Sequence, residues 1–162
     1  MNAPMEPKRI LVPVNGDESD EQAVRLACSL AKKSKGCVFI LNVVEVRRNL
    51  PVDSPQPSDL ERSESILERM DDIASRERCT AEAEVLQARE AGPALVDEAI
   101  ERDVDLIIMG LSYKKHHGEF TLGDTVPYVL MKAPCRVWIS REPMADDLSG
   151  LSIWTQQSGS RR

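Results

Sequence analysis

Aromatic side chains are scarce in this sequence: Phe, Trp and Tyr together make up 4% of its 162 residues. Basic residues are outnumbered too, with 21 Lys and Arg against 27 Asp and Glu and a formal net charge of −6. Proteins that bind nucleic acid need a basic face for the phosphates and often stack aromatic rings on the bases. The composition therefore argues against nucleic acid as a partner.

Long apolar runs are also missing. No stretch approaches the ~20 apolar residues of a membrane-spanning helix, and Met1–Lys8 is polar, without the apolar core of a signal peptide. The four cysteines are scattered without a C-x-x-C pair, which is typical of reduced, mostly buried thiols. We expect a cytoplasmic protein with no segment inserted in a membrane.

Five short apolar runs rich in β-branched residues indicate strands. They span Arg9–Val14, Cys37–Val46, Thr80–Ala88, Asp105–Met109 and Cys135–Ser140. The third run alternates apolar with acidic residues, which predicts a half-exposed strand at or near a sheet edge.

Four segments with helical spacing of apolar residues separate these strands. The patterns Ser19-x-x-Gln22 and Ser58-x-x-Glu61 predict capping boxes that open the first two helices, and Gly36 is expected to end the first. Gly92-Pro93 and Gly123-Asp124 are expected to open the other two. Alternating strands and helices predict a doubly wound α/β fold with a five-stranded parallel sheet.

We expect one domain over residues 1–140, which includes a polar loop at Leu111–Leu122, and a polar tail over residues 141–162. In a doubly wound sheet, ligands bind outside the carboxyl ends of the strands. Asn15-Gly16 and Gly110 follow two of the strands, and Gly123 begins a helix on the same rim. A flexible strand-to-helix turn is the alternative interpretation of Asn15-Gly16.

Three stretches of this sequence resemble the universal stress protein family: I-L-V-P-V-N-G, D-L-I-I-M-G and A-P-C-R-V-W-I, within Pro7–Ser140. The resemblance implies a Rossmann-like sheet of the adenine nucleotide alpha-hydrolase-like type, with strand order 3-2-1-4-5. It also implies a homodimer that pairs through the last strand, for which Val137, Trp138 and Ile139 are the candidate interface residues.

Many members of that family bind ATP through a G-x2-G-x9-G-[S/T] pattern and an Asp after the first strand. Here Gly110 and Gly123 keep the first and third glycines, but Tyr113 stands at the second and Asp124 at the Ser/Thr position. Asn15 replaces the strand-one Asp. Asp124 is expected to cap its helix and to repel a triphosphate, and Tyr113 to obstruct the approach of backbone to phosphate.

The resemblance implies an adenine nucleotide ligand, with Val43 and Met109 beside the base and the Gly110–Gly123 loop around the phosphates. Given the departures, we expect ATP to bind weakly or not at all, or AMP, a cyclic nucleotide or a dinucleotide to replace it. The adjacent His116 and His117 lack further ligands at metal spacing, so no metal is predicted. The candidate nucleotide-binding residues are Pro13, Asn15, Val43, Met109, Gly110, Tyr113, Lys114, Gly123, Asp124 and Thr125.

No catalytic motif is present, so we expect a non-catalytic, regulatory module of the stress response. Gly118–Tyr128 resembles stress-protein domains that are fused to membrane transporters or work beside them, so a nucleotide-free scaffold or regulatory domain of a transporter is an alternative. A slow ATP hydrolase is another, for which only Asp17, Glu18 and Asp124 offer support.

Overall fold

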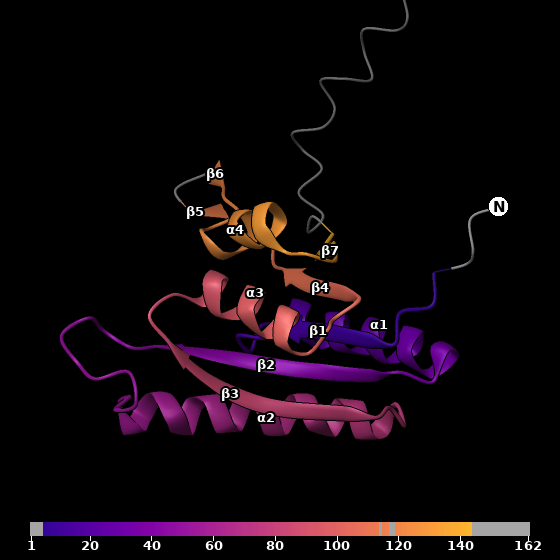
Figure 1. Cartoon of the computed structure of the whole chain (residues 1–162), viewed down its shortest axis with the longest axis horizontal. Coiled ribbons are helices and arrows are strands. Elements are labelled where there is room, and N and C mark those ends of the chain that lie inside the picture. Colours follow the sequence, from indigo (N-terminus) through magenta and orange to yellow (C-terminus); the bar gives the residue numbers. More distant parts are fainter. Residues whose placement is uncertain (1–4, 114, 117–118, 144–162) are drawn as a thin grey trace, which may run out of the picture.

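A twisted parallel sheet of five strands forms the centre of the molecule, in the order β3-β2-β1-β4-β7 (Figure 1). The computed structural model describes residues 5–113, 115–116 and 119–143, and for residues 115, 116 and 119 the backbone alone. This order confirms the predicted doubly wound sheet of order 3-2-1-4-5. The strands are β1 (Arg9–Pro13), β2 (Cys37–Glu45), β3 (Ala81–Ala88), β4 (Leu106–Leu111) and β7 (Arg136–Arg141).

Helices cover both faces of this sheet (Figure 1). One face packs against α1 (Glu18–Ser34) and α2 (Pro57–Arg76), and the other against α3 (Ala91–Glu101) and α4 (Thr125–Lys132). Within β1, Ile10 and Val12 face the first layer and Leu11 the second, and all three are fully buried. Burial on both faces explains why this strand is an uninterrupted apolar run.

The first two helices begin earlier than the capping-box patterns predict, so both of those predictions are wrong. Helix α1 has Asp17 as its N-cap, and the hydroxyl of Ser19 instead lies 3.2 Å from that of Ser112. Helix α2 begins at Pro57, one residue before the predicted Ser58. Proline suits a first helical position because the missing N–H has no partner there in any case.

Two further expectations need correction. Gly36 was expected to end α1, but the residue with left-handed backbone there is Lys35 (φ 55°). Glycine is needed at position 36 for a different reason, because a Cβ there would lie 2.4 Å from the carbonyl oxygen of Lys8. The predicted loop Leu111–Leu122 contains a two-stranded antiparallel ladder of β5 (Lys115–His116) and β6 (Glu119–Phe120). Strands of two residues are too short to show any periodicity in a sequence.

The edge positions follow the expectations more closely. Strand β3 lies at one edge, as predicted, and β7 lies at the other. The exposure along β3 does not alternate as the sequence pattern predicts, because Glu82, Ala83 and Glu84 are exposed in succession and no residue of the strand is buried. Of the cysteines, Cys28 is buried, whereas Cys37, Cys79 and Cys135 are half-buried; all four are free thiols. Across the described part of the chain, no helix combines the length and apolar character needed to cross a membrane.

Gly110, in β4, packs closely against the start of α1. A Cβ on Gly110 would lie 2.5 Å from the carbonyl oxygen of Ser19 and 2.9 Å from the backbone nitrogen of Asp20. These are backbone atoms, which cannot turn aside as a flexible side chain does. Helix α1 therefore reaches the carboxyl edge of the sheet only because residue 110 has no side chain.

We predict that Gly110→Ala lowers the free energy of unfolding by about 2 kcal/mol or more, because β4 and α1 must move apart. Gly123→Ala is the matched control: Gly123 has φ 68° but nothing within 4 Å of a Cβ, so only the left-handed backbone is penalised, by about 1 kcal/mol. Urea unfolding of both variants measures the difference. A Gly110 variant no less stable than the Gly123 variant would contradict this packing.

Candidate functional site

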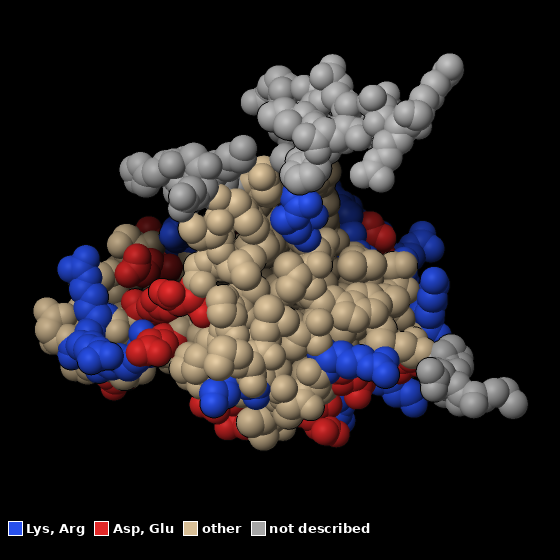
Figure 2. Space-filling model, turned by 90° about the horizontal axis from the view of Figure 1, so that it is seen from above, with Lys and Arg blue, Asp and Glu red and all other residues tan. Residues whose placement is uncertain are grey.

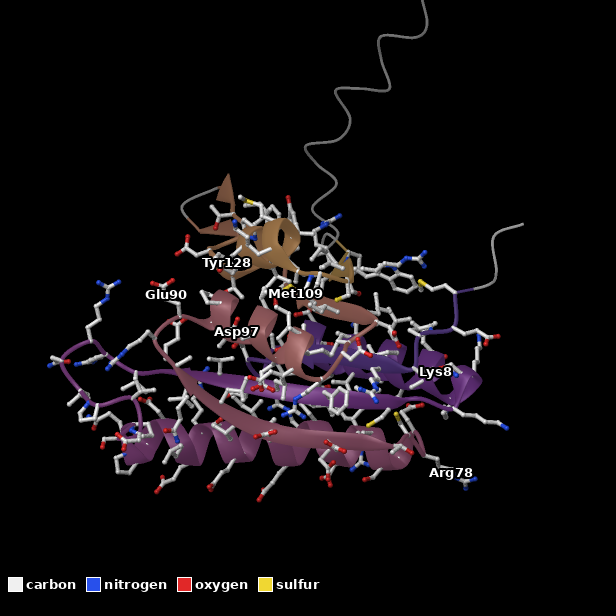
Figure 3. All side chains as sticks on the ribbon, in the orientation of Figure 1. Lys8, Arg78, Glu90, Asp97, Met109 and Tyr128 are labelled. Carbon is white, nitrogen blue, oxygen red and sulfur yellow. The ribbon has the colours of Figure 1, made fainter. Side chains whose placement is uncertain are left out.

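A cavity of ≈ 590 Å³ lies at the carboxyl ends of β1, β2 and β4, beside the first turns of α3 and α4. In Figure 3, Met109 lies at the end of β4 beneath α4, while Lys8 marks the opposite, amino end of the sheet. The cavity therefore occupies the place expected for a ligand in this fold class. Eight of the ten predicted nucleotide-binding residues line it: Pro13, Asn15, Val43, Met109, Gly110, Gly123, Asp124 and Thr125.

Of the other two predicted residues, the structure describes only Tyr113. Tyr113 is not among the lining residues; its ring stacks on that of Phe120, with the centroids 5.1 Å apart. The guanidinium carbon of Arg141 lies 4.9 Å above the Tyr113 ring. Tyr113 thus joins the β5–β6 ladder to the end of β7, whereas Lys114 lies outside the described residues.

The floor of the cavity is the turn between β1 and α1, which one buried carboxylate organises. Oδ2 of Asp20 accepts hydrogen bonds from the backbone N–H groups of Asn15, Gly16 and Asp17, at 2.7, 3.0 and 3.1 Å. Asp20 is only 4% exposed. The sequence analysis missed this residue because the pattern around Ser19 directed attention to a different cap.

Burial raises the pKa of the Asp20 carboxyl above its ordinary value. The three backbone donors act in the opposite direction, because they favour a charged acceptor, and the neighbouring charge of Asp17 adds to the rise. Burial prevails, so the carboxyl takes up a proton more readily in the folded chain than in the unfolded chain.

A second buried polar group ties the turn to α2. Asn42 donates from Nδ2 to the carbonyl oxygen of Val14 at 2.6 Å, and the Ser63 hydroxyl donates to Asn42 Oδ1. Both side chains are buried and both have partners, as buried polar groups require. An asparagine inside an otherwise apolar strand was the available signal, and the sequence analysis did not use it.

A side chain from a neighbouring strand accepts a hydrogen bond at the N-terminus of α3. Oε1 of Glu45, at the end of β2, accepts a hydrogen bond from the N–H of Ala91 at 2.9 Å. Ala91 is the first residue of α3, so Glu45 satisfies one of the donors that the start of a helix leaves unpaired. No local pattern links two residues so far apart in the sequence.

Asp124 occupies the N-cap position of α4, as predicted, but its side chain does not form the predicted capping hydrogen bond. Its backbone is helical (φ −96°, ψ −33°) rather than extended. An extended backbone is what aims an N-cap side chain at the first turn. The exposed carboxylate of Asp124 therefore borders the cavity as a negative charge.

The arrangement offers binding chemistry rather than a reactive centre. In the described part of the chain, no three His, Cys, Asp or Glu side chains are placed to hold a metal ion together. The apolar part of the lining comes from Leu41, Val43, Leu95 and Met109, which suits a flat, apolar ring. A doubly wound sheet with a cavity at this edge defines the class of α/β protein that binds its ligands at the carboxyl ends of the strands.

Comparison with known proteins agrees with this class. The sequence profile of the Universal stress protein family matches residues 6–141. A universal stress protein of Methanocaldococcus jannaschii is 26% identical over 142 residues, which cover 84% of this chain and 83% of the relative.

Solved structures share the fold at lower identity. A universal stress protein from Archaeoglobus fulgidus in complex with dAMP has a TM-score of 0.67 at 20% identity, covering 83% of this chain and 98% of that one. A universal stress protein in complex with cAMP has a TM-score of 0.63 at 20% identity, covering 86% and 100%. The chain belongs to the universal stress protein family, as the sequence resemblance predicted.

The raised pKa of Asp20 predicts a pH-dependent stability. A buried acid with a raised pKa lowers stability as pH rises from its unfolded value, 3.8, through its folded value. Asp20→Asn keeps an oxygen acceptor for the three donors but does not titrate. We expect the variant to gain stability relative to the wild type between about pH 4 and about pH 7, as measured by urea unfolding. If the wild type instead gained stability relative to the variant as pH rises, the backbone donors would outweigh burial in setting the pKa of Asp20.

Proposed function

We propose that this chain is a regulatory module of the stress response that binds an adenine nucleotide in the cavity at the carboxyl edge and binds ATP weakly. The observation that carries the proposal is the cavity itself, in which eight predicted binding residues converge. The complexes of relatives with dAMP and cAMP support an adenine ligand with a single phosphate. The spacing of Gly110 and Gly123, which matches the pattern of the family, supports the same site, and the acidic Asp124 supports weak ATP binding.

Denaturation of the purified protein, followed by chromatography and mass measurement of the extract, tests this proposal. A stoichiometric adenine compound supports a nucleotide sensor and identifies the ligand. An empty extract, together with no calorimetric response to ATP, ADP, AMP or a cyclic dinucleotide, would overturn it and favour a nucleotide-free scaffold. Metal-dependent release of phosphate from ATP would instead support the slow hydrolase.

We predict that Asp124→Ser strengthens ATP binding by roughly threefold to tenfold, because it removes a negative charge at the mouth of the cavity. Asp97→Ser is the matched control: Asp97 lies on α3, outside the cavity lining, and the net charge changes equally (Figure 3). Calorimetric titration at low salt measures both affinities. Equal gains in the two variants would assign the effect to net charge rather than to the site.

The proposed form in solution is a homodimer through β7. Val137 and Ile139 pack into the core beneath α3 and α4, whereas Trp138 faces the other side of this edge strand and is 36% exposed. Leu130 and Met131 of α4 are also exposed. Figure 2, seen from above α4 and β7, shows a broad uncharged surface with charged side chains around its margin. The uncharged middle of this edge strand, between Arg136 and Arg141, favours pairing with a second copy.

We predict that Trp138→Glu shifts the protein from dimer to monomer, because it places a charge on the pairing edge. Sedimentation equilibrium measures the mass. Arg136→Glu is the control on the same strand, because an exposed residue at the start of β7 is already charged. Matching melting curves would show that both variants fold. If the Trp138→Glu dimer dissociated no more readily than the wild-type dimer, the interface would lie elsewhere.

A further inference from the structure

Two of the free thiols, those of Cys28 and Cys79, meet at the turn from α2 into β3. Cys28 is fully buried in α1, and Cys79 is half-buried and packs against the same apolar cluster. Their side chains are hydrogen-bonded to each other. In Figure 3, Arg78, the residue before Cys79, lies at the same end of the molecule as Lys8. The thiol pair is therefore separate from the cavity, whose lining includes neither cysteine.

Two ion pairs hold this turn against α1 on either side of Cys28. The carboxylate of Glu77 lies 3.3 Å from Nη1 of Arg25 and 3.9 Å from Nζ of Lys32. Positions 25, 28 and 32 follow the i, i+3, i+7 spacing of one helix face. That face is turned toward the segment that carries Glu77 and Cys79, and Cys28 lies in its middle. The ion pairs thus place the two thiols together independently of the thiols themselves.

The backbone on both sides of Cys79 is fixed as well. Helix α2 is followed by Arg78 in the left-handed conformation (φ 54°), and the N–H of Cys79 donates to the carbonyl oxygen of Ala74 at 3.0 Å. The carbonyl oxygen of the next residue, Thr80, accepts from the N–H of Val38 at 2.9 Å, which joins it to β2. Cys79 is therefore held between a helix end and the sheet, beside its partner thiol.

Cys37 is also close enough to Cys79 for their charges to interact, but it lies on the other face of the sheet. In β2, Val38 packs in the layer of α1 and α2, whereas Phe39 packs in the layer of α3. Side chains alternate along a strand, so Cys37 shares the face of Phe39, and both border the same groove. Cys28 and Cys79 both belong to the α1 and α2 layer, which makes Cys28 the partner.

The two thiols differ in how readily they ionise. Burial raises the pKa of both. The hydrogen bond between them raises the pKa of Cys28 further but lowers that of Cys79, and the charge of Lys32 also lowers the pKa of Cys79. Cys79 is thus the more exposed thiol and the first to become a thiolate, which is the form that reacts with oxidants. Cys28 stays protonated beside it.

We propose that Cys28 and Cys79 form a reversible disulfide when the folded chain meets a hydroperoxide, such as hydrogen peroxide. The Cys79 thiolate attacks one peroxide oxygen and becomes a sulfenic acid, while the O–O bond breaks and the released hydroxide takes up a proton to give water. The Cys28 sulfur then attacks the Cys79 sulfur, the S–O bond breaks, and a second water leaves with the proton of Cys28. Two thiols lose two electrons in all, and one peroxide gains them.

The expected consequence is a redox-dependent stability. The bond would join α1 to the start of β3 and close the long loop that contains β2 and α2. A crosslink across a long loop restricts the unfolded chain, so the oxidised chain should resist unfolding better than the reduced chain. This inference goes beyond the proposed function and does not depend on whether the cavity holds a nucleotide.

Treatment of the full chain with hydrogen peroxide, followed by thiol counting and peptide mass mapping without reductant, tests the pair. We expect the loss of two thiols per chain, a linked Cys28–Cys79 peptide, and recovery of both thiols with dithiothreitol. The control variant Cys37→Ala, Cys135→Ala keeps only the pair and should react in the same way. No loss of thiols, a Cys79 that stops at a sulfinic acid, or a bond to Cys37 or to a second chain would overturn the inference.

Urea unfolding of the reduced and oxidised chains provides the second readout. We expect oxidation to raise the midpoint by roughly 1–2 M, and dithiothreitol to reverse the rise. Cys79→Ala and Cys28→Ala should each abolish the rise, and melting curves of the reduced variants show whether they fold. A midpoint that fell on oxidation of the wild type would mean that the bond forms only by distorting the fold, which contradicts a pair already in place.

Discussion

The hydrogen bonds that Asp20 accepts from the β1–α1 turn determine how the carboxyl edge of this sheet is built. Three successive backbone donors end there in a partly buried place, where a donor without a partner is costly. One oxygen of Asp20 accepts all three. Helix α1 can therefore begin only a few residues after β1 and bring Ser19 directly against Gly110. The wall and floor of the cavity both follow from this contact.

The same carboxylate gives the cavity its character. A turn of backbone donors beside a helix start is a general means of binding an anion. In this chain the donors after β1 and the first donor of α3 are held by Asp20 and Glu45, so the carboxylates of the chain itself satisfy backbone groups that line the cavity.

The two sheet edges are treated in opposite ways. Strand β3 presents Glu82 and Glu84, and both pair with Arg102, which also bonds to Glu98 at 2.7 Å. Charges of this kind protect an edge from unwanted strand pairing. Strand β7 carries no comparable network among the described ion pairs and exposes Trp138. The two edges therefore differ in how well they are protected against pairing with another strand.

The sequence by itself determined the fold class and the place of the cavity, because apolar periodicity and strand–helix alternation are local properties that indicate a parallel sheet. The strand order came only from the resemblance to the family. Asn15, Gly110, Gly123 and Asp124 were found in this way. Tertiary structure decided the rest. The bonds of Glu45 to Ala91 and of Asn42 to Val14 and Ser63 join segments that no motif connects. The ring of Tyr113 stacks on Phe120 beside Arg141 and does not line the cavity. Such pairings depend on which strands lie side by side, and only the folded chain brings those strands together.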